Sequence, residues 1–299
     1  MGCVESLHGK PTLAPTDTRL TLTARRSKSG GAVELNIRHF SQTEVVMPEW
    51  TVDLSVSGPI TTNRKIHFRV EKGNIDPFWT NVSVRRAAHG VVISLVARAE
   101  NQTDANDAAL YFVGQALDLL CLEIEIPMYV SLTGTQIRPV NDNVKRIVQL
   151  NEWTDCFQRA REIGMNRPIY SRALSWHRKG KNSEDPVDAF LAFWSAIEGV
   201  GSRFARDTDR ARRGSVNQIC DCFDQLWQGV GTWKVIPDKP ETINEFHSIR
   251  NGISHGFISV DVDTVKSVAS KLSLISKLAL EFLRDWHAGG ADPEPRQGA

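Results

Sequence analysis

Arg250 and His255 lie five positions apart and carry the two kinds of side chain that chemistry on a phosphate ester needs. The guanidinium group of arginine stays charged, and its fork of donors matches the oxygens of a phosphate. Histidine titrates near neutral pH and can take up or release a proton. An ideal helix would place two side chains at this spacing about 140° apart. Gly252 and Gly256 predict that the helix ends or turns near His255, which relaxes that constraint.

Two charged residues fall on helix faces that the apolar pattern predicts to be buried. Glu198 lies four residues after Trp194 and continues its stripe, and Arg250 lies four residues after Phe246. An unpaired charge inside a protein core is strongly unfavourable. Two interpretations are open. In one, Glu198 and Arg250 form a salt bridge or reach solvent at helix ends, and in the other both line a cleft that holds an anion.

Basic side chains gather at two places near this pair. One set follows Glu198 and consists of Arg203, Arg206, Arg210, Arg212 and Arg213. The other set consists of His177, Arg178, Lys179 and Lys181. Because the net charge of the chain is only +1, an RNA-binding surface would have to be local. Arg203, Arg206, Arg178 and Lys179 are the candidate RNA-binding residues. A solvated loop is the alternative for the first set, since Asp207 and Asp209 dilute its charge.

The elements that would position these residues are helices. After Pro139 the apolar residues recur with a period of about 3.6. Helices are predicted over residues 151–163, 167–179, 215–227 and 240–249, with 203–214 as a charged loop. Asp185 and Pro186 suit the cap and the first position of another helix. Asp261 caps a long helix that reaches Trp286, roughly 39 Å at about 1.5 Å per residue.

The preceding part of the chain has a period of two, which is typical of half-buried strands. The alternating sets are Leu20 and Leu22; Val33, Leu35 and Ile37; Val52, Leu54 and Val56; Ile66, Phe68 and Val70; and Val91, Ile93 and Leu95. A helix capped by Thr103 or Asp104 and a strand within 124–132 follow. The sequence therefore predicts an α+β fold with two domains. Residues 1–135 form a β-rich α+β domain, 136–287 an all-α bundle, and 288–299 a disordered tail.

Composition limits the function further. Hydrophobic residues make up 41% and charged residues 24%, as in soluble globular proteins, and no apolar run approaches the roughly 18 residues that a membrane span requires. The five cysteines show no metal-ligand spacing, so neither a metal nor a cofactor is expected. Scattered thiols fit a reduced, cytoplasmic protein.

The segment 250–255, Arg-Asn-Gly-Ile-Ser-His, resembles the signature of the HEPN superfamily, in which an arginine, a polar residue and a short spacer precede a histidine. Asn251 is the polar residue here. The runs 170–180 and 185–198 resemble early helices of the ApeA-like and methylamine-utilisation-associated HEPN branches. The resemblance covers residues 151–286.

This resemblance implies a four- or five-helix bundle that dimerises, so that two such segments face each other across a cleft. It implies a metal-independent endoribonuclease in a bacterial toxin or antiviral defence system. By position, His255 would be the acid and base, Arg250 would bind the scissile phosphate, and Asn251 would orient it. The apolar stripe, rather than the family pattern, assigns to Glu198 the role of supporting Arg250.

Two other functions remain open. In one, the helical domain is a non-catalytic HEPN module that binds a nucleotide or RNA, or only dimerises. In the other, the β-rich domain is a sensor that recognises a ligand or partner. The expected partners are RNA or a nucleotide, a second copy of the chain, and a regulatory or antitoxin protein, with no membrane involved.

Overall fold

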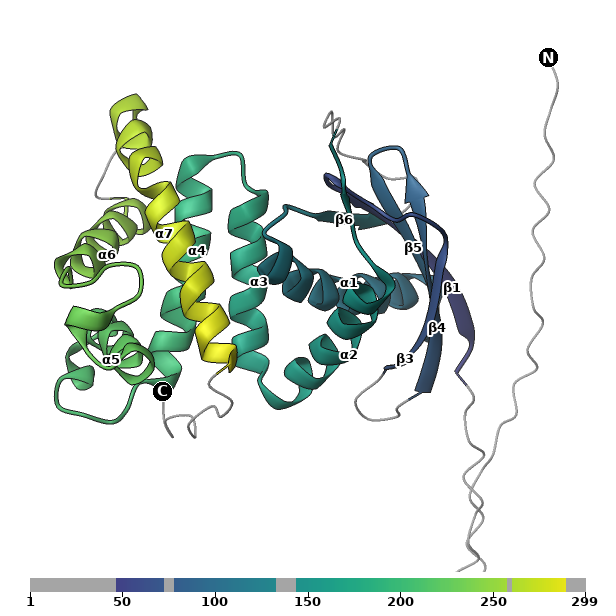
Figure 1. The fold of residues 1–299 in the computed structure, drawn as a ribbon, viewed down its shortest axis with the longest axis horizontal. Coiled ribbons are helices and arrows are strands. Elements are labelled where there is room, and N and C mark those ends of the chain that lie inside the picture. The colour runs from purple at the N-terminus through teal and green to yellow at the C-terminus, as the bar shows by residue number, and fades with distance from the viewer. Residues whose placement is uncertain (1–46, 73–77, 133–143, 257–259, 289–299) are drawn as a thin grey trace, which may run out of the picture. The chain divides into compact units, whose positions relative to one another are not determined.

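The computed structural model describes residues 47–72, 78–132, 144–256 and 260–288. An antiparallel sheet is followed by a helical region, so the predicted α+β class is confirmed (Figure 1). Residues 46–299 belong to one compact unit, and the division into domains at residue 135 stays a prediction. The strands predicted within 18–37 lie outside the described residues. Of the tail predicted for 288–299, Ala288 instead ends helix α7, and 289–299 lie outside the described residues.

The sheet has the strand order β3-β4-β5-β1-β6, and each neighbouring pair is antiparallel. Its strands are β1 Glu49–Ser57, β3 Ile66–Lys72, β4 Phe78–Ala87, β5 Gly90–Arg98 and β6 Tyr129–Leu132. Val52 pairs with Leu95, and Leu54 pairs with Ile93. All four are buried, so the alternating residues build one wall of the core. Two short strands, β2 (Ile60–Thr61) and β7 (Arg146–Ile147), form a separate parallel pair.

Helix α1 (Gln102–Ile124) connects the sheet to the other helices. It begins after Asn101, whose side-chain oxygen accepts a hydrogen bond from the backbone N–H of Asp104 at 3.0 Å. The helix cap is therefore Asn101 rather than the predicted Thr103 or Asp104. One side of α1 packs against β1 and β5, and another side packs against α2 and α3. This explains why so many of its residues are buried.

The C-terminal end of α1 is closed by a residue from the last helix of the chain. Arg284 Nη2 donates to the carbonyl oxygens of Leu122 and Glu123 at 2.8 and 2.9 Å. Helix termini leave such carbonyls without partners inside the helix. A positive side chain is favourable there, because it faces the negative end of the helix dipole.

The helical region continues with α2 Leu150–Asn166, α3 Pro168–Asn182, α4 Pro186–Phe204, α5 Ser215–Trp227, α6 Glu241–Ser254 and α7 Val262–Ala288, and with the short 3-10 helices η1 Ala211–Arg213 and η2 Val230–Thr232. Helix α4 packs against α3, α5, α6 and α7. The two predicted caps are confirmed. Asp185 accepts hydrogen bonds from the first turn of α4, and Asp261 Oδ1 accepts one from the N–H of Thr264 at 2.8 Å.

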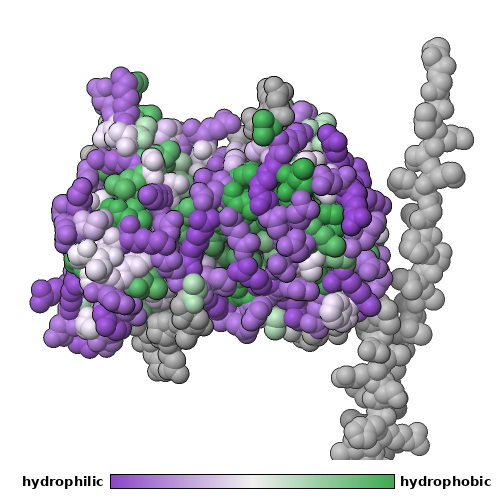
Figure 2. Space-filling view, viewed as in Figure 1, coloured by the Kyte–Doolittle hydropathy of each residue, from purple (hydrophilic) through white to green (hydrophobic). Residues whose placement is uncertain are grey.

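The buried residues of the sheet and of the helices form one continuous hydrophobic core. Hydrophilic residues cover most of the face seen in Figure 2, with smaller apolar areas between them. Among the described helices, none combines the length and the apolar character that crossing a lipid bilayer requires.

Candidate functional site

The segment 250–255 forms the last turn of α6, because the helix continues to Ser254 instead of ending at residue 249. His255 is the C-cap residue, and its backbone N–H donates to the carbonyl oxygen of Asn251 at 3.0 Å. Gly256 follows with φ +68°, a left-handed conformation that ends a helix and that glycine adopts without strain. The predicted end of the helix near His255 is therefore confirmed, and His255 lies exposed at that end.

Arg250 points to Glu198 on α4. Its Nη2 atom lies 3.4 Å from Glu198 Oε2, and the side chains remain 33% and 21% exposed. The salt bridge that the sequence left open as one interpretation is thus formed. It is only partly buried, so the guanidinium group keeps a face that a ligand can reach.

A second contact extends this pair along α6. Arg250 Nη1 donates to Asn251 Oδ1 at 2.8 Å, and Asn251 Nδ2 lies 3.1 Å from Nε2 of His247. The His247 ring in turn lies against the buried Trp194 ring of α4, with centroids 5.9 Å apart. Glu198, Arg250, Asn251 and His247 therefore form one connected network, which we call the α6 network.

His247 is the member of the α6 network that the sequence analysis missed. It precedes Asn251 by four residues and His255 by eight, a spacing that places all three on the same side of a helix. This spacing is the sequence signal that could have identified His247 as a neighbour of Asn251. His255 is joined to the α6 network through its backbone hydrogen bond to Asn251.

Most of the predicted RNA-binding arginines are bound to carboxylates. Arg206 Nε and Nη2 both donate to Asp221 Oδ1, at 3.0 and 2.6 Å, and these bonds raise the pKa of the guanidinium. Arg178 Nε donates to the buried Asp118 Oδ1 at 2.5 Å. Their positive charge is largely balanced within the fold, so neither presents an open cationic surface.

His177 contributes no positive charge to its basic set. It is 1% exposed, neither ring nitrogen has a hydrogen-bond partner among the described residues, and burial lowers its pKa to about 3. It is therefore neutral at physiological pH. Lys179 is exposed and lies over the Trp176 ring, with Nζ 4.2 Å from the ring centroid.

Arg203 has a different environment from Arg206. It lines a pocket of about 220 Å³ between α3 and α4, together with Arg172, Trp176 and Ser202. Its Nε atom is buried and has no hydrogen-bond partner among the described residues. Glu198 precedes Gly199, another lining residue, by one position, so this α3–α4 pocket adjoins the α6 network.

Metal-ligand clusters and reactive thiols are two other kinds of group that could carry chemistry in this fold. Among the described residues, no three His, Cys, Asp or Glu side chains lie close enough together to hold a metal ion. Burial raises the pKa of the Cys121 thiol to about 12, which keeps it protonated and unreactive. A phosphate held by arginine, with proton transfer by histidine, remains the chemistry that these side chains suit.

The chain was compared with protein-family models, with curated proteins and with solved structures, and none of them matches it.

Proposed function

We propose that this protein is a metal-independent endoribonuclease of the HEPN type, with Arg250, Asn251 and His255 as its catalytic residues. The α6 network is the observation that carries this proposal. In it, Arg250 Nη2 lies 3.4 Å from Glu198 Oε2, and Arg250 Nη1 donates to Asn251 Oδ1 at 2.8 Å. The exposed His255 follows Arg250 by five positions, at the end of the same helix. Glu198 is then a positioning residue, since it acts through Arg250.

Cleavage of the RNA backbone needs a cation at the phosphate, a base and an acid, and each of these roles has its own side chain. Arg250 holds the non-bridging oxygens of the scissile phosphate, where negative charge grows during attack. His255 takes the proton from the ribose 2′-hydroxyl, whose oxygen bonds to phosphorus as the 5′-oxygen leaves. The products are a 2′,3′-cyclic phosphate and a 5′-hydroxyl, and the leaving oxygen takes a proton from a second acid. In a homodimer, the His255 of the other copy supplies that acid.

The α3–α4 pocket gives the RNA a second point of contact beside the α6 network. Arg172 and Arg203 take part in no ion pair among the described residues, and Trp176 offers an aromatic face. A phosphate bound by the two arginines with a base stacked on the ring matches how single-stranded nucleic acid binds to proteins.

Exposed apolar residues favour the homodimer. Val260, Val262 and Leu274 are 54%, 67% and 38% exposed; the first two lie at the start of α7, and Leu274 lies near its middle. The start of α7 follows the segment 250–255 closely in sequence. Covering these residues with a second copy would bring two Arg250–His255 segments together.

The proposal also covers the division of the chain into domains and the regulation of its activity. Residues 136–287 are an HEPN-like bundle, and residues 1–135 a separate β-rich domain that recognises a ligand or a regulatory partner. An antitoxin or another component of a defence system would hold the nuclease inactive.

The test is cleavage of end-labelled single-stranded RNA by the purified chain in the presence of EDTA. The unmodified chain should cleave, His255→Ala should not, and His67→Ala should cleave normally, because His67 is an exposed histidine on β3. No cleavage by the unmodified chain, or equal cleavage by His255→Ala, would overturn the proposal. The mass in solution tests the dimer.

A second candidate function is a non-catalytic module that binds a nucleotide or RNA. The observation that favours it is the Glu198–Arg250 ion pair, since Arg250 is already partly neutralised. RNA binding that is retained without cleavage, and that is weakened by Arg203→Ala, would select this function over the nuclease.

A further inference from the structure

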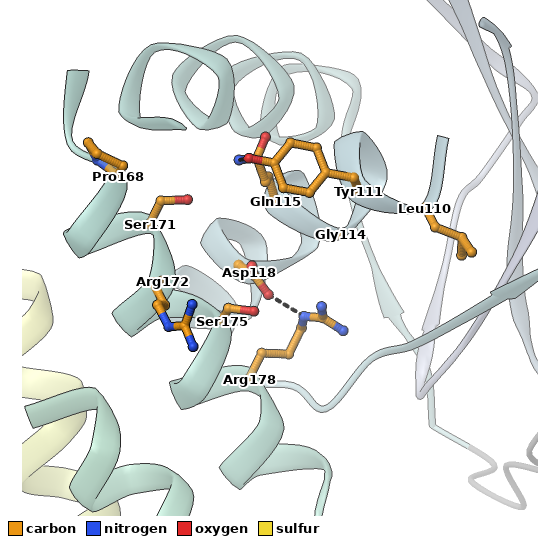
Figure 3. A pocket seen from close by; sticks show the side chains of 10 residues that line it. All are labelled: Leu110, Tyr111, Gly114, Gln115, Asp118, Pro168, Ser171, Arg172, Ser175 and Arg178. Carbon is orange, nitrogen blue, oxygen red and sulfur yellow. Dashed lines mark hydrogen bonds and ion pairs between the residues drawn. The ribbon is translucent and has the colours of Figure 1, made fainter. Parts of the chain in front are cut away.

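A second and larger pocket, of about 390 Å³, lies between α1 and α3 (Figure 3). Packed helices usually present apolar side chains to each other. Here each helix presents a polar stripe at positions i, i+4 and i+7. The stripe on α1 consists of Tyr111, Gln115 and Asp118, and the stripe on α3 consists of Ser171, Ser175 and Arg178.

The bottom of this α1–α3 pocket is an ion pair between the two helices. Arg178 Nε donates to Asp118 Oδ1 at 2.5 Å, and Arg178 Nη1 donates to the carbonyl oxygen of Met128 at 3.3 Å. The side chains of Arg178 and Asp118 are only 14% and 6% exposed. Burial raises the pKa of the Asp118 carboxyl, and the nearby Arg178 opposes that rise.

The second terminal nitrogen of Arg178 is directed at Gly114. A Cβ atom at Gly114 would lie 3.7 Å from Arg178 Nη2, so the absence of a side chain there leaves room beside the guanidinium group. The bonds of Arg178 to Asp118 and Met128 use Nε and Nη1 and leave Nη2 to face Gly114. This nitrogen is therefore a donor at the bottom of the pocket.

The walls add further donors. Figure 3 shows the hydroxyl groups of Ser171 and Ser175 pointing from α3 toward Gln115 and Asp118 on α1. The Gln115 amide donates to Tyr111 Oη at 2.9 Å, which holds both groups at the upper wall. Gly164 of α2 packs close to this amide, since a Cβ there would meet Gln115 Nε2 at 2.8 Å.

The charge and the shape of the α1–α3 pocket indicate an anion with an apolar body. Arg172 and Arg178 bring two positive charges and Asp118 one negative charge, so a single anionic group balances the lining. Leu110 and the ring of Tyr111 give the rim an apolar side. The donors outnumber the two oxygens of a carboxylate and suit the three oxygens of a phosphate.

We propose that the α1–α3 pocket binds a small organic phosphate monoester that carries a planar ring. The phosphate group lies between Arg172, Arg178 Nη2 and the Ser171 hydroxyl, beside the Ser175 hydroxyl that bonds to Asp118. The ring lies against Tyr111. Arg172 lines both this pocket and the α3–α4 pocket, so it can serve either one. The proposal does not rest on RNA cleavage, because no residue of the α6 network lines the α1–α3 pocket.

Calorimetric titration of the full chain with phenyl phosphate, phenol and inorganic phosphate tests the proposal. Phenyl phosphate should bind about tenfold or more tightly than phenol, which lacks the charge, and more tightly than inorganic phosphate, which lacks the ring. Equal binding of phenol and phenyl phosphate would overturn the proposed chemistry.

Two variants test the location. Ser171→Ala removes one donor and leaves both the Asp118–Arg178 pair and the Ser175–Asp118 bond intact, and it should weaken the binding of phenyl phosphate about fivefold. Gly114→Met fills the space beside Arg178 and should abolish binding. The control is Ser270→Ala, because Ser270 is an exposed serine on α7 that donates only to the carbonyl oxygen of Ser267 at 2.6 Å. If both pocket variants melt as the control does and bind phenyl phosphate with its affinity, the site is elsewhere.

Discussion

Arg250 Nη2 lies 3.4 Å from Glu198 Oε2, and this ion pair joins the last turn of α6 to the middle of α4. The two residues are 52 positions apart, and each occupies a position where its helix otherwise presents apolar residues. The pair has two consequences for binding. It fixes the direction of the guanidinium group, and it lowers the net charge that a phosphate would meet.

Glu198→Gln separates these two consequences. Removing the carboxylate charge should strengthen RNA binding about three- to tenfold, while changing the free energy of unfolding by less than about 1 kcal/mol, because the pair is partly exposed. The cleavage rate at saturating RNA should fall, since Arg250 loses its charged anchor. Fluorescence anisotropy with labelled RNA measures the affinity. Glu245→Gln is the matched control, because Glu245 pairs with Lys271 elsewhere on α6 and α7. Unchanged or weaker binding by Glu198→Gln would contradict this account.

His177 predicts how the stability of the fold depends on pH. Burial lowers its pKa to about 3, whereas an unfolded histidine titrates near 6.5. The unfolded state therefore binds the extra proton first, and stability is lost as the pH falls from 6.5 toward 3, by about 4 to 5 kcal/mol in total.

Replacing His177 by leucine should remove that loss. His177→Leu should also gain on the order of 1 kcal/mol at pH 7, because two buried ring nitrogens without partners disappear next to Phe193. Urea unfolding at pH 7, 6, 5 and 4 measures both effects. A pH dependence as steep as that of the unmodified chain would show that other groups dominate it.

Gly180 allows α3 and α4 to approach closely. A Cβ atom there would lie 2.8 Å from the ring of the buried Phe193, so Gly180→Ala should destabilise the protein by roughly 1 to 3 kcal/mol. Gly199 is the matched control on α4, since a Cβ at that position meets nothing within 4 Å. Gly199→Ala should be neutral or stabilise by up to about 1 kcal/mol, because alanine favours helix. Thermal unfolding in parallel distinguishes the two. Equal effects would mean that helix propensity, rather than packing, decides at both positions.

Lys72 is a charged group that the sheet buries without a hydrogen-bond partner. Its Nζ lies 5.0 Å from the centroid of the Phe112 ring, and burial lowers its pKa to about 8. Because the unfolded pKa is near 10.5, stability should rise as the pH increases from about 8 to 10.5. Below pH 8 the buried charge costs about 3 kcal/mol.

Lys72→Met should therefore stabilise the protein by about 2 to 3 kcal/mol at pH 7, because its thioether chain fills the same space without a charge. The gain should shrink as the pH rises toward 10.5. Chemical denaturation at pH 7 and pH 10 provides the comparison. A loss of stability at pH 7 would show that the contact with Phe112 outweighs the desolvation.

The sequence predicted the helices well because their signals are local. The limits of α5 agree with the predicted 215–227, and Asp185 and Asp261 cap the helices assigned to them. The sheet was harder to predict. Strand β4 was missed although Thr80, Val82 and Val84 are buried on it, because only two of these residues are apolar and the large apolar Trp79 lies on the exposed side.

The candidate site was predicted in part. The stripes of α4 and α6 placed Glu198 and Arg250 on facing sides, and the structure brings the two together. His247 was missed although its spacing to Asn251 and His255 was visible in the sequence. The partners of the basic residues could not be inferred, because they depend on which elements pack together. Asp118 and Arg178 are 60 positions apart, and Arg206 and Asp221 are 15 apart. No local pattern indicates that these arginines are neutralised.

The contact of Arg284 with the end of α1 has a consequence for synthesis. The carbonyl oxygen of Leu122 receives this hydrogen bond from a residue 162 positions later in the chain. During translation, α1 leaves the ribosome long before its terminal carbonyls find their partner. The growing chain must therefore keep that helix end hydrated, or shielded by a chaperone, until α7 has been made. Released chains truncated before Arg284 should consequently be cut by protease near Leu122, and the full chain should resist.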